Sequence, residues 1–306
     1  MKLFSVLAAL LLMQSCNSSK DMNAKNNNEY IPGKLDVQAH RGGRGLMPEN
    51  TVASMMHGLA YGVATLEMDV VITKDKKVIL SHEPFFNSEI TTKPDGSFVN
   101  HEEEKELNIY KMDYAEVLKY DVGLKPHPRF PKQEKAAAVK PLLSDVFEAV
   151  KNYMKEAKRP YPFFNIETKS QPASDNVYHP APAEFVELLM DDIKKYKLEE
   201  EVIIQSFDFR TLQYLHKKYP HIKTAMLVEA DDNRSFRKQL DDLGFMPTIH
   251  SPAYELVTEN LIKECHEKNI KIIPWTVNDK ATFDKLKSMG VDGIITDFPD
   301  LNEIRF

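Results

Sequence analysis

Three carboxylates stand at positions in the sequence where a metal ion could be bound. Glu67 and Asp69 are two residues apart in the apolar stretch TLEMDV, so on a strand both side chains point to the same face. Glu167 lies at the end of another apolar stretch, in NIETKS. Buried carboxylates repel each other unless a cation joins them, and three without thiolates suit one hard divalent ion, Ca²⁺ or Mg²⁺. The alternative for any single carboxylate is a structural ion pair with Arg41 or Lys169.

Two histidines and two cations accompany these carboxylates. His40 and Arg41 directly follow DVQA, His82 follows VILS, and Lys169 lies two residues after Glu167. A histidine pair can divide the roles of general acid and general base, because imidazole titrates near neutral pH. Arg41 and Lys169 provide fixed positive charge for an anion. Together these groups predict phosphoryl transfer, in which charge on the phosphoryl oxygens is stabilised and one proton moves at each end.

The remaining histidines carry less information. His250 ends an apolar stretch, and its position is equally consistent with packing and with substrate contact. The others fall on predicted helices, tails or an insertion and are interpreted as structural: His57, His101, His127, His179, His216, His221 and His266.

The elements that must position these residues alternate between short β-branched strands and amphipathic helices. From residue 35 onward, eight stretches have the composition of strands: 36–40, 65–70, 162–168, 201–207, 223–228, 247–252, 270–277 and 292–296. Apolar residues three and four apart predict helices between them, for example over 181–197 and 210–219. This rhythm predicts a (β/α)8 TIM barrel, in which chemistry gathers at the carboxyl ends of the strands. A doubly wound open sheet is the alternative, but GGRG after the first strand lacks the G-x-G-x-x-G spacing of that fold.

Two segments interrupt the alternation of strands and helices. Residues 65–82 contain two apolar runs around the polar turn TKDKK and predict a hairpin. Folding it about Asp75 and Lys76 places Asp69 opposite His82. Residues 84–140 are polar and rich in Pro and Lys, too long for a plain loop, and predict a small insertion subdomain over the active face.

The N-terminal residues predict export rather than membrane spanning. Lys2 precedes a short apolar run that ends at Ser15 and Cys16, the layout of a signal peptide over 1–15 with a lipidated cysteine after it. Plain secretion with cleavage nearby is the alternative. Residues 16–33 are a polar tether, and 34–306 form the barrel domain. We therefore expect a protein lipid-anchored to the membrane of a bacterial envelope, periplasmic or on the cell surface.

The bulk composition excludes other classes of protein. The 306 residues are 42% hydrophobic and carry a formal net charge of −6 without a long basic block, so no nucleic-acid partner is expected. Cys265 is the one other cysteine, which leaves neither an intrachain disulfide nor a thiolate metal cluster in the mature domain.

The motifs resemble those of a known family. AHRGGRGLMPENT, LEMDVVITKDKKVILSHEP, NIETK, QSFD, PWTVN and VDGIITDFP resemble, in this order, the glycerophosphodiester phosphodiesterases of the phosphatidylinositol-phospholipase-C-like superfamily. The resemblance covers nearly the whole chain after the tether. It implies metal ligands at Glu67, Asp69 and Glu167 and catalytic histidines at His40 and His82. It also implies phosphate contacts at Arg41 and Lys169, a substrate-lining role for Trp275, and support of the first loop by Asn50 and Thr51. The family usually has Asp after the second histidine, where this chain has Glu83.

The resemblance also implies the reaction. A divalent cation and Arg41 would bind the phosphodiester of a small glycerophosphodiester substrate, His82 would act as base and His40 as acid. The products would be sn-glycerol 3-phosphate and an alcohol. One alternative is lysophospholipase D or phospholipase-C-like activity on lipid phosphodiesters. Another is a lipoprotein that binds phosphodiesters without catalysis, since barrel scaffolds host unrelated functions.

Overall fold

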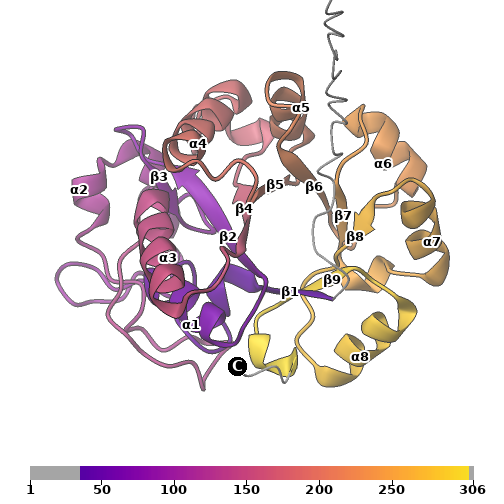
Figure 1. Cartoon of the computed structure of the whole chain (residues 1–306). Coiled ribbons are helices and arrows are strands. Elements are labelled where there is room, and N and C mark those ends of the chain that lie inside the picture. The colour runs from indigo at the N-terminus through magenta and orange to yellow at the C-terminus, as the bar shows by residue number, and fades with distance from the viewer. Residues whose placement is uncertain (1–34, 303–306) are drawn as a thin grey trace, which may run out of the picture. The chain divides into compact units, whose positions relative to one another are not determined.

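The domain is built around eight parallel strands. The computed structural model describes residues 35–302 (Figure 1). Each of the eight stretches expected to be strands contains one, and the spatial order is β8, β7, β6, β5, β4, β2, β1, β9. The bounds are β1 Asp36–Ala39, β2 Thr65–Ile72, β4 Phe163–Thr168, β5 Val202–Ser206, β6 Lys223–Val228, β7 Ile249–Pro252, β8 Lys271–Ile272 and β9 Gly293–Thr296.

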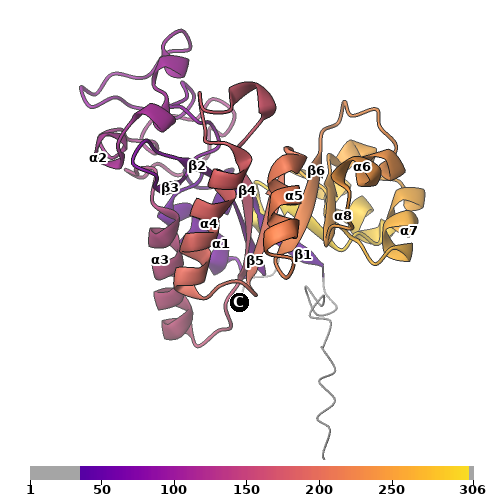
Figure 2. The same cartoon turned by 90° about the horizontal axis from the view of Figure 1, so that it is seen from above.

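The sheet closes on itself through the backbone around β8 and β9. Asp292 donates its backbone N–H to the Ile272 carbonyl at 3.0 Å. Ile295 donates to the Pro274 carbonyl at 2.9 Å, and Val277 donates to the Ile295 carbonyl at 3.0 Å, as in a β-ladder. The structure is therefore a (β/α)8 barrel, and the open doubly wound alternative is wrong. Figure 2 shows helices outside the strands. They are α1 Val52–Ala60, α3 Leu143–Ala157, α4 Pro182–Tyr196, α5 Phe209–Lys218, α6 Phe236–Leu243, α7 Glu259–Glu267 and α8 Lys280–Met289.

Alternation along each strand separates a polar barrel interior from an apolar outer layer. On β4, Phe164 and Ile166 point outward, and the Phe164 ring packs 5.0 Å from Phe147 of α3. The alternate residues, Asn165 and Glu167, belong to the inner face, where they meet other polar side chains. The apolar layer holds the helices on the barrel, and the inner face is free to carry chemistry.

The register of the hairpin formed by β2 and the next strand differs by one residue from the register expected from the sequence. β3 (Val78–Leu80) pairs with β2 so that Val70 lies opposite Leu80, and Ser81 rather than His82 faces Asp69. The reason is a three-residue loop that ends with Lys76 in the left-handed conformation at φ 62°. His82 is thus the first residue beyond the paired part of the hairpin.

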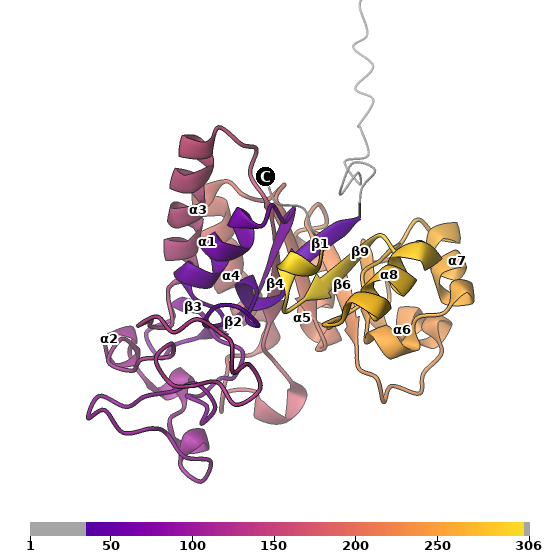
Figure 3. The ribbon, with the colours of Figure 1, turned by 90° about the horizontal axis from the view of Figure 1, so that it is seen from below.

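The segment 84–140 has an apolar cluster of its own. It contains the short helix α2 (Tyr114–Val117) and packs against the outer side of the hairpin (Figure 3). Seven buried side chains from the hairpin and the segment form this cluster: Val71, Ile79, Phe86, Ile90, Ile109, Val117 and Val122. The segment is thereby fixed to the strand pair that leads to His82.

The predicted signal peptide, the tether and Cys16 lie outside the described residues. Within 35–302, the structure contains no helix of the length and apolar character needed to span a bilayer.

His250 occupies the layer between the barrel and its helices. Its side chain is buried, its ring lies 4.9 Å from that of Phe236 on α6, and its Nδ1 has no hydrogen-bond partner among the described residues. Burial lowers the pKa of His250 to about 3. Of the two roles left open from the sequence, packing is the one the structure supports.

The buried His250 predicts a pH dependence of stability. Its folded pKa lies below the ordinary value, so the unfolded chain binds one more proton as the pH falls from about 6.5 towards 3. The stability this group provides is present above pH 6.5 and is lost below it, by about 1.4 kcal/mol for each pH unit. We expect His250→Leu to flatten the fall in unfolding free energy between pH 7 and 5, measured by urea titration. His221→Gln, at an exposed position, is the control and should retain the wild-type slope. An unchanged slope in His250→Leu would contradict the assignment.

Candidate active site

The three predicted carboxylates meet at the carboxyl ends of β2 and β4. These strands are neighbours, and their register places Asp69 directly beside Glu167, with Glu67 two residues earlier on the same face. One carboxylate oxygen from each of the three lies within 4.8 Å of the others, and all three side chains are buried. The parallel pairing of the two strands brings together residues about 100 positions apart in the sequence.

The electrostatics of this cluster favour a bound cation. Burial, with the charges of Asp69 and Glu167 added, raises the pKa of Glu67 well above its usual range. Burial also raises the pKa of Glu167, to about 7. Burial acts on Asp69 in the same direction, but the charges of Arg41 and Lys169 outweigh it and lower the pKa of Asp69.

The donor set fits a hard divalent ion. Asp69 Oδ1 is buried without a hydrogen-bond partner among the described residues, so it is available as a ligand. Oxygen donors alone, all from carboxylates, are the set that Ca²⁺ and Mg²⁺ prefer. A cation held by Glu67, Asp69 and Glu167 would remove the repulsion that raises two of their pKa values.

A chain of amides inside the barrel holds Glu67 from below. Gln205 Nε2 donates to Glu67 Oε1 at 2.8 Å, and Asn165 Nδ2 donates to Gln205 Oε1 at 3.0 Å and to Gln38 Oε1 at 2.8 Å. Gln38 in turn donates to Asp36 at 2.7 Å. The sequence analysis missed these residues, although polar side chains recurring every second position on otherwise apolar strands are the signal of a polar interior.

His40 is oriented by a carboxylate that the sequence analysis also missed. Its Nδ1 lies 2.6 Å from Asp297 Oδ1, just beyond β9, and its Nε2 lies 4.0 Å from Glu67. Asp297 also accepts from Arg44 at 2.6 Å and from Asn278 at 2.7 Å. Burial lowers the pKa of His40, while Asp297 opposes that shift. Asp297 stands at the end of the last predicted strand, in the stretch TDFP, a position that could have identified it.

Arg41 is placed by an unusual turn after β1. Arg41, Gly42 and Gly43 all have positive φ, and a Cβ at Gly42 would lie 2.6 Å from the backbone of Ser54, so only glycine fits there. The turn directs the Arg41 backbone N–H to Glu67 at 2.8 Å. The Arg41 guanidinium lies 3.2 Å from Asp69 Oδ2.

Two further residues hold Arg41 and Asp69 in this arrangement. Glu49 accepts from Arg41 Nη1 at 2.9 Å, and this pairing lowers the pKa of Glu49 to about 2 in spite of burial. Asn50 donates to Asp69 Oδ2 at 2.8 Å and accepts the Asp69 backbone N–H at 3.2 Å. Thr51 donates its hydroxyl to the Pro48 carbonyl at 2.8 Å and is also the N-cap of α1, so the PENT stretch combines loop support with helix initiation.

His82 reaches the same end of the barrel from the hairpin. Its Nδ1 lies 2.7 Å from Glu83 Oε1, and its side chain remains 28% exposed. Burial and the charges of Arg41 and Lys169 lower the pKa of His82 to about 4, so this imidazole is neutral at pH 7.

Lys169 and Trp275 occupy different parts of the mouth. Lys169 Nζ lies 2.8 Å from Glu167 and 3.9 Å from Asp69, so it belongs to the carboxylate cluster. Trp275 follows β8, donates its indole N–H to the Ser251 carbonyl at 2.9 Å and meets the Phe207 ring edge-on at 5.5 Å.

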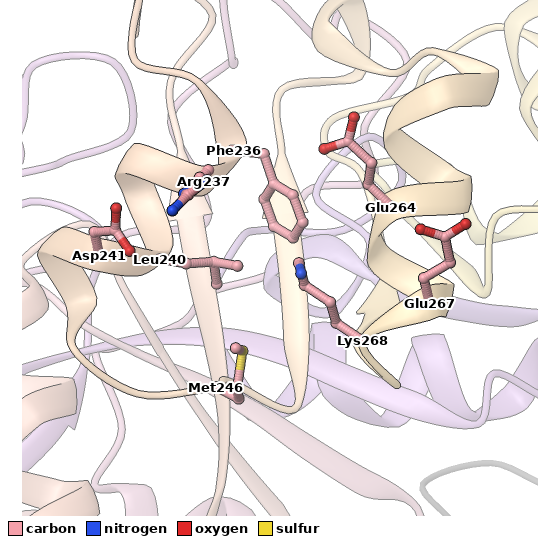
Figure 4. Close-up of a pocket in the computed structure, with 8 residues that line it drawn as sticks. All are labelled: Phe236, Arg237, Leu240, Asp241, Met246, Glu264, Glu267 and Lys268. Atoms are coloured by element: carbon pink, nitrogen blue, oxygen red, sulfur yellow. The ribbon is translucent and has the colours of Figure 1, made fainter.

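A separate cavity of about 440 Å³ lies between α6 and α7 (Figure 4). It is lined by Phe236, Arg237, Leu240, Asp241, Met246, Glu264, Glu267 and Lys268, none of which belongs to the carboxylate and histidine cluster. This cavity is thus distinct from the cluster at the barrel mouth.

Comparisons with known proteins show which proteins this chain resembles. The sequence model of the Glycerophosphoryl diester phosphodiesterase family matches residues 40–301. A glycerophosphodiester phosphodiesterase of Caldanaerobacter subterraneus subsp. tengcongensis is 31% identical over 269 residues, which cover 87% of this chain and 96% of that protein.

Solved structures match over similar lengths. A crystal structure from Silicibacter pomeroyi superposes with a TM-score of 0.78 at 29% identity, covering 89% of this chain and 92% of that one. An Oleispira antarctica phosphodiesterase in complex with the product sn-glycerol 3-phosphate has a TM-score of 0.69 at 21% identity, covering 91% and 98%. At 21% identity, the second similarity is evidence for a shared fold alone.

The amide that supports Glu67 predicts an effect on metal affinity. Gln205→Leu keeps much of the side-chain volume but removes the donor that orients Glu67 Oε1. We expect the affinity for Ca²⁺ or Mg²⁺ to fall about 10- to 100-fold, as for other groups that orient metal ligands, in calorimetric titration of the metal-free protein. Gln213→Leu, on the surface of α5, should bind metal as the wild type does. Equal affinities in the two variants would argue against the proposed ligand support.

Proposed function

The chain belongs to the glycerophosphoryl diester phosphodiesterase family, and we propose that it hydrolyses glycerophosphodiesters with one divalent cation and two histidines. The products are sn-glycerol 3-phosphate and an alcohol. The observation that carries this proposal is the meeting of three buried carboxylates with the imidazole of His40, whose Nε2 lies 4.0 Å from Glu67.

Glu67, Asp69 and Glu167 would hold the cation. When bound, a hard divalent cation neutralises developing charge on the phosphoryl oxygens. Arg41 and Lys169, both within ion-pair distance of Asp69, add positive charge on the same side of the phosphodiester. Their fixed positions support stabilisation of the transition state without rearrangement of the site.

The environments of the two histidines favour different roles. His82 is neutral at pH 7 because burial and nearby cations lower its pKa, so its free Nε2 can take a proton from the attacking oxygen. His40 has the buried Asp297 against its Nδ1, which opposes the lowering of its pKa by burial, so we assign His40 as the acid whose Nε2 gives a proton to the leaving alcohol. The attacking oxygen belongs to water or to a neighbouring glycerol hydroxyl. In the second case a cyclic phosphate forms and is then opened by water.

Trp275 and Phe207 would contact the uncharged part of the substrate. Their edge-to-face pair lies beyond the carboxyl ends of β8 and β5 and presents an apolar surface there. The indole N–H is already bonded to Ser251, which leaves the ring for carbon contacts with the glycerol moiety.

We also propose, from the sequence around Ser15 and Cys16, that the protein is exported and lipid-anchored in the envelope. Cys16→Ser should then move it from the membrane fraction to the soluble fraction. An unchanged distribution would favour secretion without an anchor.

The proposed roles of the two histidines predict that turnover depends on each of them. We expect His40→Ala and His82→Ala each to lower release of sn-glycerol 3-phosphate from glycerophosphocholine by about 100-fold or more, because each removes one proton transfer. The assay follows release in chelator and after addition of Ca²⁺ or Mg²⁺, with lysophosphatidylcholine as a second substrate. His101→Ala, at an exposed position of the insertion, is the control.

Turnover within a few-fold of wild type in either histidine variant would refute the mechanism. Cleavage of lysophosphatidylcholine with glycerophosphocholine spared would identify a lysophospholipase D instead.

A further inference from the structure

The segment 84–140 begins and ends beside the loop that carries His82. Residues after the segment continue the sheet, because Leu80 donates its backbone N–H to Pro141 at 2.9 Å and Ile79 bridges Leu142 in antiparallel fashion. Extending this register by two residues places Lys140 opposite Ser81. Side chains of opposed residues lie on the same face of a strand pair, so Lys140 and Ser81 are direct neighbours.

A chain of hydrogen bonds runs from Lys140 across His82. Lys140 Nζ donates to Ser81 Oγ at 2.7 Å, and Ser81 Oγ donates to the backbone carbonyl of Glu83 at 2.5 Å. The Ser81 backbone N–H is bound to the carbonyl of Asp69 at 3.0 Å. His82 lies between the two residues that this chain connects, so the chain fixes the peptide units on both of its sides.

The position of Lys140 is costly for a lysine. Its side chain is buried, and its ammonium lies 5.4 Å from the centroid of the Phe86 ring. Its hydrogen-bond partner among the described residues is a neutral hydroxyl, although Glu49, Glu83 and Asp69 act on it through their charge. An apolar side chain in the same place would avoid the desolvation of an ammonium group.

Other contacts hold the two ends of the His82 loop, and Lys140 acts on the part between them. Ile109 donates its backbone N–H to Pro84 at 3.0 Å and holds the far end of the loop, while the ladder with β2 holds the near end. Between these contacts, the Ser81 hydroxyl donates to the Glu83 carbonyl and closes a turn of the backbone. The ammonium polarises this hydroxyl and so strengthens the bond to Glu83.

We propose that Lys140 is a positioning residue for His82, acting through Ser81 to hold the loop 81–83. This inference rests on the proposed function, in which His82 is the general base. A base must stand within hydrogen-bond reach of the proton it removes, so a loosened loop lowers turnover more than substrate binding. The segment 84–140 therefore contributes to catalysis through its last residue.

The test compares Lys140→Met, Ser81→Ala and the double variant in the full chain. With glycerophosphocholine and saturating Ca²⁺ or Mg²⁺, we expect Lys140→Met to lower kcat between about tenfold and 100-fold and to leave KM within about threefold. Ser81→Ala should lower kcat similarly. The double variant should be no worse than the more impaired single variant, because both substitutions break the same chain of hydrogen bonds. Lys132→Met, an exposed lysine of the same segment, should behave as wild type.

Three outcomes would overturn the assignment. The first is kcat within twofold of wild type in Lys140→Met. The second is multiplied losses in the double variant, which would mean independent roles. The third is a parallel change in kcat, KM and melting temperature, which would mean a general structural role.

Two further controls keep the result interpretable. Should Lys140→Met fail to fold, Ser81→Ala decides alone, because it removes one oxygen from a strand end and keeps the lysine. The proposed function fails separately, if His82→Ala retains wild-type turnover or the wild type releases no sn-glycerol 3-phosphate.

Discussion

Mutual repulsion among Glu67, Asp69 and Glu167 is the constraint on which the surrounding structure depends. Three carboxylates with oxygens within 4.8 Å of one another, buried at the mouth of a barrel, are unfavourable without positive charge between or around them. The chain places two permanent cations, Arg41 and Lys169, at the edge of this cluster. These offset the charge of Asp69 but leave Glu67 and Glu167 with raised pKa values, which is the electrostatic condition for binding a divalent ion.

The polar interior of the barrel follows from the same constraint. A carboxylate such as Glu67 needs donors beneath it, and Gln205 provides one at 2.8 Å. Gln205 must itself be satisfied, which brings in Asn165 and then Gln38. The amides thus extend the order of the site downward through the barrel, while the apolar outer layer, with Phe164 against α3, supplies the stability.

The two histidines show how unlike surroundings can separate two identical side chains. His40 is paired with Asp297, which directly follows β9, whereas the His82 imidazole is paired with Glu83, its neighbour on the hairpin loop. The residue after β9 therefore orients one of the two proposed proton-transfer groups, and the hairpin loop carries the other. In the proposed mechanism, this division connects an insertion packed outside the barrel to the chemistry at its mouth.

The sequence by itself determined the strand and helix alternation, the barrel and the residue types of the site. It could do so because strand periodicity, loop glycines and carboxylates two residues apart are local properties. It did not determine the hairpin register, because the three-residue loop depends on Lys76 adopting a left-handed conformation. It also did not identify Asp297, Gln205 or Lys140, whose partners are 257, 138 and 59 positions away. Only the closure of the barrel and the return of the chain after the insertion bring these pairs within hydrogen-bond distance, and no local pattern encodes such contacts.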